Sequence, residues 1–457
     1  MAELKRTIGP VQLMLYGLGS MLGAGIYGLV GKAAGMMGGA VWMAFLVAMV
    51  AALLTGVSYA SIASRYPKAA GAAYVAHLAY RSPWLSYLVG LAIVCSGLAS
   101  IATQSKVVAE NLNTLVDLDF GFSIAGTSAD VMLIAIGFLL LVGAIVYQGI
   151  SESLWVNAVC TLLESLGLIL VIAVGLRFWG QADLFQAPAT IANPTGALTA
   201  GLLLQGSVLT FFSFIGFEDM LNVSEEVRQP ERTIPAALIG AMVVASLIYM
   251  AVAITAVSVV PWQELAKAPG PLKLVIERAA PWFPAVGFTL ITIAAVANTA
   301  LVNYVMGSRL LYGMARQGLL PAALGRVHGV RQTPHVAVGV LLAIVIGLQF
   351  AGDITQLAGA TVLLLLFVFT LVNGALVVLK RREGDIAGCF NAPTFVPVLG
   401  AAICLVMIAA RVRQDDWRGP AIAGGLIVMI LGLYALTRGG RQAGTGQPPP
   451  GSTLDSP

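Results

Sequence analysis

Two adjacent acidic residues interrupt a strongly apolar part of the sequence. Glu218 and Asp219 follow the segment 207–217, which consists of apolar, hydroxyl and glycine residues only. An ionised side chain inside a membrane helix costs about 2.5–3.5 kcal/mol, so such a residue faces a cavity or a partner. Carboxylates placed in this way can bind a cation or exchange a proton. A third acid, Glu164, lies within another apolar run and is open to the same chemistry.

A series of glycines near the N-terminus forms a second candidate site. The stretch from Tyr16 has glycine at positions 17, 19, 23, 25, 28 and 31. Glycine costs about 1 kcal/mol relative to alanine inside a helix and lets the backbone leave the helical conformation. An interrupted helix exposes unpaired N–H groups that can bind a carboxylate. The alternative is close helix packing, because Gly19 and Gly23 also form a small-xxx-small pattern.

The elements that carry these residues are expected to be membrane-spanning helices. The chain has 457 residues, of which 58% are hydrophobic and only 10% are charged, whereas a soluble protein carries about 25% charged residues. Each crossing needs about 20 mostly apolar residues. The sequence therefore predicts an all-α integral membrane protein with twelve spans, near residues 10–32, 39–62, 85–112, 131–149, 155–179, 200–222, 236–260, 283–308, 335–352, 354–379, 395–412 and 419–437.

The composition also excludes several classes of function. The net charge of +4 is scattered along the chain, so nucleic acid is not an expected partner. The four cysteines are far apart and the three histidines lack metal-ligand spacing, so no metal site is expected. Residues 23–28 match G-x-G-x-x-G, but they lie within a span and not in the βαβ unit that gives this pattern meaning. Without a Walker motif or a nucleophile–base set, neither an enzyme nor a cofactor is expected.

The distribution of Lys and Arg predicts how the spans are oriented. With the N-terminus inside, 16 of the 25 Lys and Arg lie on the cytoplasmic side, as the positive-inside rule requires. We therefore expect a multi-pass protein of the cell membrane with both termini in the cytoplasm. Residues 438–457 are rich in Gly, Pro and Ser and are expected to form a disordered cytoplasmic tail.

The two candidate interruptions lie in spans 1 and 6, and their spacing predicts the architecture. An offset of five spans gives equivalent helices opposite orientations, which is the arrangement of an inverted five-helix repeat. The first repeat is expected over residues 1–180, the second over 200–380, and two extra helices over 381–437. Discontinuous helices 1 and 6 would meet at the midplane, where helical N–H groups bind a carboxylate and free carbonyls bind an ammonium.

Five motifs resemble those of amino acid permeases of the amino acid–polyamine–organocation (APC) superfamily, whose members share the LeuT-type fold of two five-helix repeats. They occur in the family's order and cover most of spans 1 to 9. The motifs are Gly19–Tyr27 in span 1, Phe212–Glu218 in span 6, Glu225–Pro235 in the following cytoplasmic segment, Tyr66–Gly71 after span 2 and Ser308–Arg316 after span 8.

This resemblance implies roles for individual residues. The backbone groups that would hold the substrate carboxylate are those of Gly23, Ala24, Gly25 and Ile26. The carbonyls that would hold the substrate amine are those of Phe212, Ser213 and Ile215. Phe212 would also serve as an aromatic gate over the substrate, the alternative being a lipid-facing Phe.

Polar side chains within other spans are candidates for the cavity wall. The residues expected to line it are Ser20, Ser100, Thr299 and Asn303. For the hydroxyl residues among them, the alternative is a hydrogen bond to the carbonyl four residues earlier in the same helix.

Glu164 and Glu218 are the candidate residues for ion coupling. Glu164 aligns with a position where many proton-coupled members of the family carry a Lys, so the chain departs from the family pattern there. A buried carboxyl favours its neutral form and can carry a proton. A carboxyl at Glu164 could also pair with a base, bind a cation or make a structural hydrogen bond. An acid at the position of Glu218 is common in the family, and its alternative role is a structural hydrogen bond across the break.

These features together predict a secondary active transporter of amino acids, driven by proton symport, with alternating access around a midplane site. The expected partners are an amino acid substrate, the proton as coupling ion, and the lipid bilayer. Two alternatives stay open. One is an amino acid or polyamine exchanger that is not driven by protons, and the other is a channel or a non-transporting sensor on the same fold.

Overall fold

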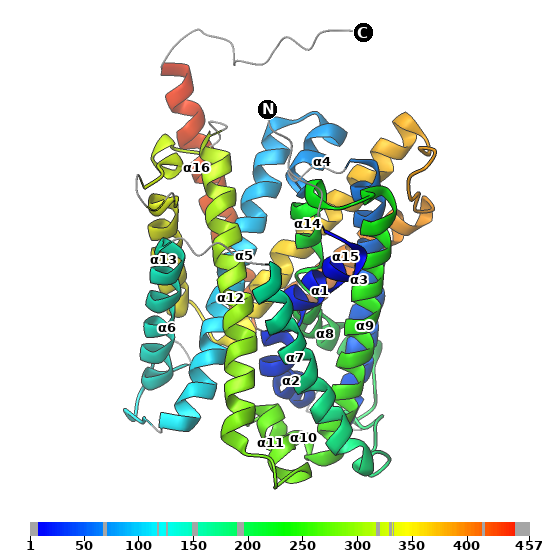
Figure 1. Ribbon diagram of the computed structural model, residues 1–457, viewed down its shortest axis with the longest axis vertical. Coiled ribbons are helices and arrows are strands. Elements are labelled where there is room, and N and C mark those ends of the chain that lie inside the picture. Colours follow the sequence, from blue (N-terminus) through cyan, green and yellow to red (C-terminus); the bar gives the residue numbers. More distant parts are fainter. Residues whose placement is uncertain are drawn as a thin grey trace.

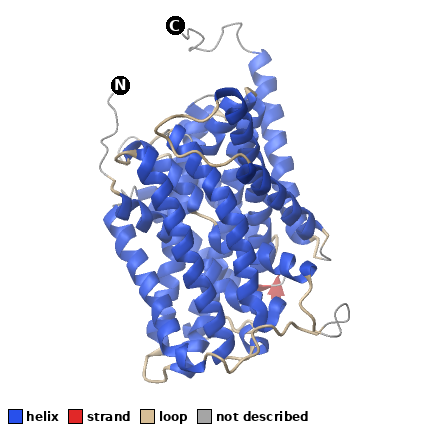
Figure 2. Ribbon diagram, turned by 90° about the vertical axis from the view of Figure 1, so that its right-hand side faces the viewer, coloured by secondary structure: helices blue, strands red, loops and turns tan. Residues whose placement is uncertain are grey.

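The computed structural model is a bundle of long helices that run along the same axis (Figure 1). It describes residues 8–66, 71–116, 118–124, 127–148, 154–189, 196–316, 320–328, 331, 333–413 and 416–443. The only strands in these ranges are β1 (Ser123–Ile124) and β2 (Thr127–Ser128), which form a small antiparallel pair. Figure 2 shows how small this departure from an all-helical fold is.

The helices follow one another along the chain with few long connections. The α-helices are α1 (Pro10–Met21), α2 (Ala24–Met37), α3 (Val41–Arg65), α4 (Gly71–Tyr80), α5 (Pro83–Val116), α6 (Ala129–Gln148), α7 (Leu154–Gly175), α8 (Ala200–Phe211), α9 (Pro230–Val259), α10 (Trp262–Leu265), α11 (Pro271–Ala279), α12 (Ala285–Arg316), α13 (His335–Gln349), α14 (Ile354–Glu383), α15 (Phe395–Val412) and α16 (Arg418–Ala443). The 3₁₀ helices are η1 (Gly38–Ala40), η2 (Leu176–Phe178), η3 (Phe212–Phe214), η4 (Phe217–Glu226) and η5 (Ala322–Gly325).

Helix is found at every segment for which the sequence predicts a span. Within the described residues, nine helical segments are long and apolar enough to cross a membrane, and α13 and the apolar part of α16 are shorter. The short helices α4, α10 and α11 lie between predicted spans and were not predicted. The last helix runs to Ala443, so residues 438–443 are helical and not disordered as expected, while 444–457 lie outside the described residues.

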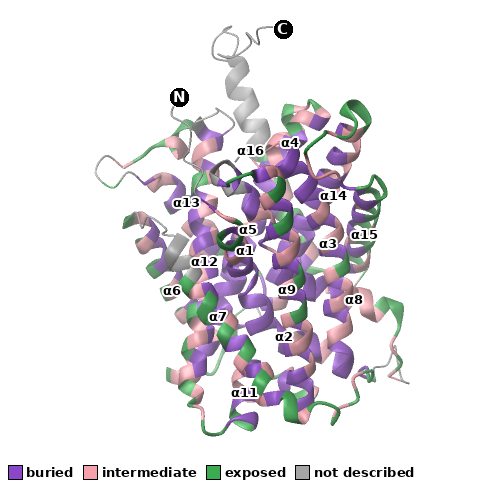
Figure 3. Ribbon diagram, turned by 45° about the vertical axis from the view of Figure 1, so that its right-hand side comes forward, coloured by how far each residue is buried: buried purple, intermediate pink, exposed green. Residues whose placement is uncertain are grey.

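The outer surface of the bundle is apolar, and its interior is tightly packed. Figure 3 shows buried residues along the inward faces of the long helices. Large exposed hydrophobic side chains lie on outer helices, among them Leu141 on α6, Leu166 on α7 and Leu405 on α15. An apolar outer surface of this kind suits lipid as its solvent. The structure thus supports the expected integral membrane protein.

Small residues let the helices approach closely in the interior. Helix α3 packs along α9, and a Cβ at Gly56 of α3 would lie 2.3 Å from the sulfur of Met242 on α9. The long helix α5 packs against both α12 and α14. Close contact between helices through small residues is the packing expected where lipid supplies no hydrophobic driving force.

The two ends of the bundle carry different extramembrane elements. Helix α4 lies at one end and α11 at the opposite end (Figures 1 and 3), and α10 lies beside α11 (Figure 1). The end with α4 is the one for which the Lys and Arg distribution predicts a cytoplasmic location, and the end with α10 and α11 is the predicted outer side.

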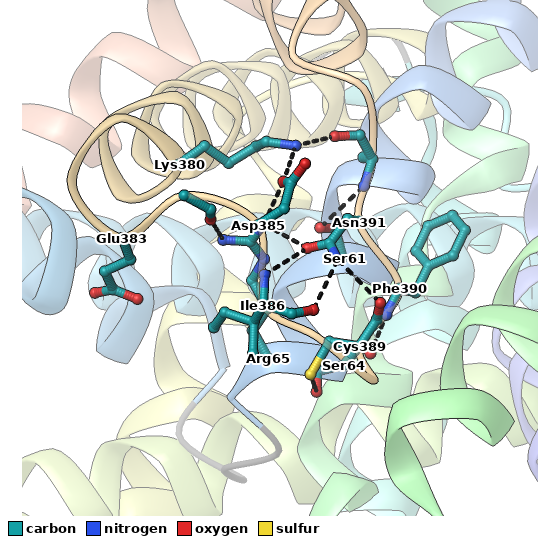
Figure 4. A network of polar contacts seen from close by, with 12 residues as sticks. Ser61, Ser64, Arg65, Lys380, Glu383, Asp385, Ile386, Cys389, Phe390 and Asn391 are labelled. Carbon is teal, nitrogen blue, oxygen red and sulfur yellow. Dashed lines mark hydrogen bonds and ion pairs between the residues drawn. The ribbon is translucent and has the colours of Figure 1, made fainter.

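A polar network at the α4 end fastens the connection after α14 to α3 (Figure 4). The Arg65 side chain is fully buried and donates to the Gly384 carbonyl (3.0 Å), Asp385 Oδ1 (3.1 Å) and Asn391 Oδ1 (2.6 Å). Lys380, near the end of α14, pairs with the same Asp385 carboxylate at 2.7 Å. The segment 384–394 is thereby held against α3, and we call it the α14–α15 strap.

Candidate functional site

The first candidate site is a break in the helical backbone between α1 and α2. The N–H of Leu22 still bonds to the Leu18 carbonyl (2.8 Å), whereas the first bond of the next helix runs from the Tyr27 N–H to the Gly23 carbonyl (3.1 Å). The N–H groups of Ala24, Gly25 and Ile26 therefore precede the first hydrogen-bonded turn of α2. Such groups at a helix N-terminus suit an anion.

A second break follows α8. The chain passes through the 3₁₀ turn η3, becomes extended at Ile215 (φ −64°, ψ 135°) and takes a left-handed conformation at Gly216 (φ +118°) before η4 begins. Only glycine adopts this φ without steric cost. The local sequence Ile215-Gly216 thus ends one helical segment and starts another within the bundle.

The two breaks lie against each other. A Cβ at Gly216 would come within 2.5 Å of the Ser20 carbonyl oxygen, and a Cβ at Gly25 within 2.5 Å of the Ser213 Cα. The hydroxyl of Tyr249, on α9, lies 2.7 Å from the Met21 carbonyl and 2.8 Å from the Ser213 carbonyl. Tyr249 therefore links the last turn of α1 to the turn after α8.

A small cavity of about 20 Å³ lies between the two breaks and the walls formed by α5 and α12. That volume holds about one water molecule. Its described lining contains no ionisable side chain and consists of Ser20, Met21, Gly23, Ala24, Gly25, Ser100, Gln104, Phe212, Ile215, Gly216, Thr299 and Asn303.

A larger cavity of about 370 Å³ adjoins the small one and shares Ser100, Ile215 and Asn303 with it. Its wall continues to residues 71–73 of α4 and to Arg309 of α12. This larger cavity therefore leads from the two breaks toward the end of the bundle that carries α4.

Most of the residues predicted to bind substrate meet at the small cavity. Nine of the eleven residues that were predicted for the carboxylate, the amine or the cavity wall line it. Ile26 is buried outside the lining, and the Ser213 side chain packs against Gly25. Thr299 also bonds to the carbonyl of Ala295 four residues earlier (3.2 Å), which is the alternative considered for hydroxyls.

Glu164 lies behind this site and does not line either cavity. It is 1% exposed on α7, and its Oε1 accepts a hydrogen bond from Asn298 Nδ2 at 3.3 Å. Its backbone carbonyl accepts one from the Tyr27 hydroxyl at 2.6 Å. The other carboxylate oxygen, Oε2, is buried and has no partner among the described residues. Glu164 therefore connects α7 to both α2 and α12.

Glu218 lies in the wall of the larger cavity, together with Asp219 and Tyr59. Its Oε2 accepts a hydrogen bond from the Gly216 N–H at 2.9 Å. This bond stabilises the left-handed turn at the second break, as the structural alternative for Glu218 proposed. The carboxylate still faces the cavity, so the bond leaves a part in ion coupling open.

Sequence reasoning missed three residues that hold or line the site. Asn298 could be predicted only if its contact with Glu164 were known. Tyr249 lies in an apolar helix, and no motif in the surrounding sequence marks it as a site residue. Gln104 stands in the polar run Thr103–Lys106, which is an unusual feature of a membrane helix and a signal that was available. Among the described residues, no group of three or more His, Cys, Asp or Glu could hold a metal ion.

Comparison with known proteins identifies the family of this chain. The model of the family described as amino acid permease matches residues 8–435. The chain belongs to the amino acid permease family. Membership makes the protein a permease and not an enzyme, and it places the two breaks in a family of membrane transport proteins.

Relatives of this permease match between 71% and 97% of the chain. The branched-chain amino acid permease of Bacillus subtilis is 28% identical over 430 residues, which cover 89% of this permease and 88% of the relative. An uncharacterized transporter of Mycobacterium tuberculosis is 30% identical and covers 97% of this permease and 95% of its own length. The chloroplastic cationic amino acid transporter 9 of Arabidopsis thaliana is 28% identical, covering 71% of this permease and 58% of the relative.

Proposed function

We propose that this permease is a secondary active transporter that carries amino acids across the cell membrane by proton-coupled symport. The observation that carries the proposal is the meeting of two backbone breaks at a cavity with an uncharged lining. The polar groups there complement a zwitterion, because helical N–H groups suit its carboxylate and free carbonyls suit its ammonium. The cavity, which holds about one water molecule, must widen when the substrate enters.

The proposed architecture has twelve spans, with α1 and α2 as the first, discontinuous span and α8 to η4 as the sixth. Helices α1 to α7 form one five-span repeat, and α8 to α14 form the inverted second one. Helices α15 and α16 complete the chain. In the proposed orientation both termini and α4 are cytoplasmic, so the larger cavity opens inward.

In the proposed binding mode the carboxylate meets the start of α2 and the amine meets the second break. The N–H groups of residues 23–26 surround the carboxylate. The carbonyls of Phe212, Ser213 and Ile215 accept from the ammonium, with the Ser213 carbonyl shared with Tyr249. Phe212, which is buried in the wall of the small cavity, acts as the gate that separates the bound substrate from the larger cavity.

Coupling is assigned to Glu164 and Glu218. Glu164 is enclosed, touches both α2 and α12 through its hydrogen bonds, and has one oxygen free of partners among the described residues. Protonation of that carboxyl would change its hydrogen bond with Asn298 of α12, one of the two elements that flank the substrate. Glu218 would respond to the proton concentration in the inward cavity and pass the change to Gly216.

The test is uptake of labelled amino acids into proteoliposomes that contain the purified full-length permease. Three conditions are compared: an imposed proton gradient, a sodium gradient, and neither. We expect concentrative uptake only with the proton gradient. Exchange with preloaded amino acid but no net uptake would replace symport by exchange. The absence of both uptake and exchange for every amino acid would overturn the proposal.

One observation favours a second candidate, an exchanger of cationic amino acids or polyamines. The wall of the larger cavity contains two carboxylates, Glu218 and Asp219, and one guanidinium, Arg309. The excess of acid would attract a second positive charge on the substrate. The name of the Arabidopsis thaliana relative agrees with this reading. Competition by arginine and by alanine in the same proteoliposomes separates the two candidates, because only a cationic site would prefer arginine.

A further inference from the structure

Gln104 is a buried polar residue in the wall of the small cavity that the predicted binding residues leave without a role. It lies on α5, is 2% exposed, and lines the cavity together with Gly23 and Gly25. Its Nε2 donates to Ser100 Oγ at 3.3 Å. Its Oε1 is buried and has no hydrogen-bond partner among the described residues. A buried amide oxygen without a partner costs free energy that a bound donor would recover.

The neighbours of Gln104 on the same helix are engaged elsewhere. Thr103 donates to the Ala99 carbonyl at 2.9 Å, and Ser105 donates to the Ala102 carbonyl at 2.9 Å. Lys106 is fully buried and donates to Thr127 and to the Gly352 carbonyl. Within the run 103–106, Gln104 is therefore the side chain that faces the cavity with an unused acceptor.

The acceptors already predicted for the substrate amine are partly occupied. The Ser213 carbonyl accepts from Tyr249, and the Phe212 carbonyl accepts from the Ile215 N–H at 3.3 Å. An ammonium group has three N–H donors. An additional acceptor in the wall of the same cavity would complete its coordination, and Gln104, which lines that cavity, carries an acceptor without a partner among the described residues.

We propose that Gln104 is a substrate-binding residue, and that its Oε1 accepts a hydrogen bond from a donor on the amino acid in the small cavity. The inference rests on the proposed transport of amino acids. The donor has two possible sources with the same chemistry, the α-ammonium group or a hydroxyl on a short side chain such as that of serine. A site that bonds a substrate donor rejects analogues that lack it.

The experiment compares uptake kinetics of wild type, Gln104→Met and Gln104→Glu in proteoliposomes, with alanine and serine as substrates. Methionine keeps the length of the side chain but lacks the acceptor, and glutamate keeps both. We expect Gln104→Met to raise KM about tenfold or more, and Gln104→Glu, which keeps an acceptor, to raise it less. Thr103→Val is the matched control, since Thr103 bonds within its own helix, and its KM should not change.

The pattern of loss identifies the donor. An equal rise of KM for alanine and serine with Gln104→Met assigns the bond to the ammonium, and a rise for serine alone assigns it to the side-chain hydroxyl. Unchanged KM for both substrates overturns the proposal. If Gln104→Met does not fold, Gln104→Asn withdraws the acceptor by one methylene and must show the same loss. A wild type that carries neither substrate nor any other amino acid would instead overturn the proposed transport itself.

Discussion

At the scale of single residues, the contact between the two breaks depends on the absence of a side chain at Gly25. A Cβ there would lie 2.5 Å from both the Cα and the Oγ of Ser213. We expect Gly25→Ala to force the breaks apart, to cost about 1–3 kcal/mol as overpacking does, and to abolish uptake. Gly137 of α6 has open space around its Cβ position, so Gly137→Ala is the matched control. Normal uptake by Gly25→Ala in proteoliposomes would remove the carboxylate site from this position.

Glu164 gives the residue-scale prediction for coupling. Glutamine at this position keeps the shape and can still accept the bond from Asn298, but it carries no ionisable proton. We expect Glu164→Gln to lose accumulation driven by a proton gradient and to retain exchange of amino acid across the membrane. Ser165→Ala on the next position of α7, whose hydroxyl bonds to Thr161 of the same helix, should retain both. Wild-type accumulation in Glu164→Gln would leave the carboxyl a structural role.

How far the site could be foreseen differs from residue to residue. The glycines at positions 23, 25 and 216 were predictable, because only a residue without a Cβ permits the left-handed turn at Gly216 and the close approach at Gly25. The hydroxyl of Tyr249 and the amide of Gln104 were not, because their roles depend on which helices pack beside them. A pattern within one segment contains no information on its neighbours.

At the scale of elements, the α14–α15 strap depends on one guanidinium. Arg65 has no exposed side-chain surface and satisfies three acceptors. Arg65→Met would leave the Gly384 carbonyl without this donor and Asn391 Oδ1 with the Ile386 N–H alone. We expect a loss of about 1–3 kcal/mol in stability, measured as a lower Tm of the purified permease in detergent. Arg381 lies exposed at the same end of α14, and Arg381→Ala should leave Tm unchanged. An equal Tm for both variants would mean that the strap adds no stability.

The pH dependence of the strap follows from Asp385. Its hydrogen bond from Lys380, and the charges of Lys380 and Arg65, hold the pKa of this carboxyl below its usual value. A group whose pKa is lowered by folding stabilises the folded state above its unfolded pKa and loses that contribution as pH falls through the folded pKa. The Tm difference between wild type and Asp385→Asn should therefore persist at neutral pH and shrink in acid. A Tm difference that grows as the pH falls would contradict a stabilising role for the ion pairs of Asp385.

Element boundaries were less predictable than the apolar segments themselves. Hydropathy locates a span because each crossing needs a long apolar run, and helix lies at every predicted segment. Helices α4, α10 and α11 were not predicted, because they are short and lie in the connections between spans. The hydropathy criterion detects only apolar runs long enough to cross a membrane. The helical residues 438–443 were not predicted because, like the tail beyond them, they contain Gly and no apolar run, although the backbone continues α16.

At the scale of the whole molecule, the central proposal is the direction in which the chain crosses the membrane. Helix α4 lies at one end of the bundle (Figure 1), where the α14–α15 strap lies too. The larger cavity leads toward this end, which the excess of Lys and Arg predicts to be cytoplasmic. If the orientation were reversed, the same cavity would open outward, and the proposed pathway of substrate release would become one of substrate entry. Orientation therefore decides how the structure relates to the transport cycle.

The native cysteines provide a test of orientation without added labels. Cys95 and Cys404 are buried and Cys160 lies within α7, whereas Cys389 is partly exposed in the α14–α15 strap. A membrane-impermeant maleimide should therefore label the permease in inside-out vesicles and leave it unlabelled in right-side-out vesicles. Cys389→Ser should abolish the labelling, which ties the signal to the strap. Labelling of Cys389 in right-side-out vesicles would invert the topology and place both the strap and the larger cavity on the outer face.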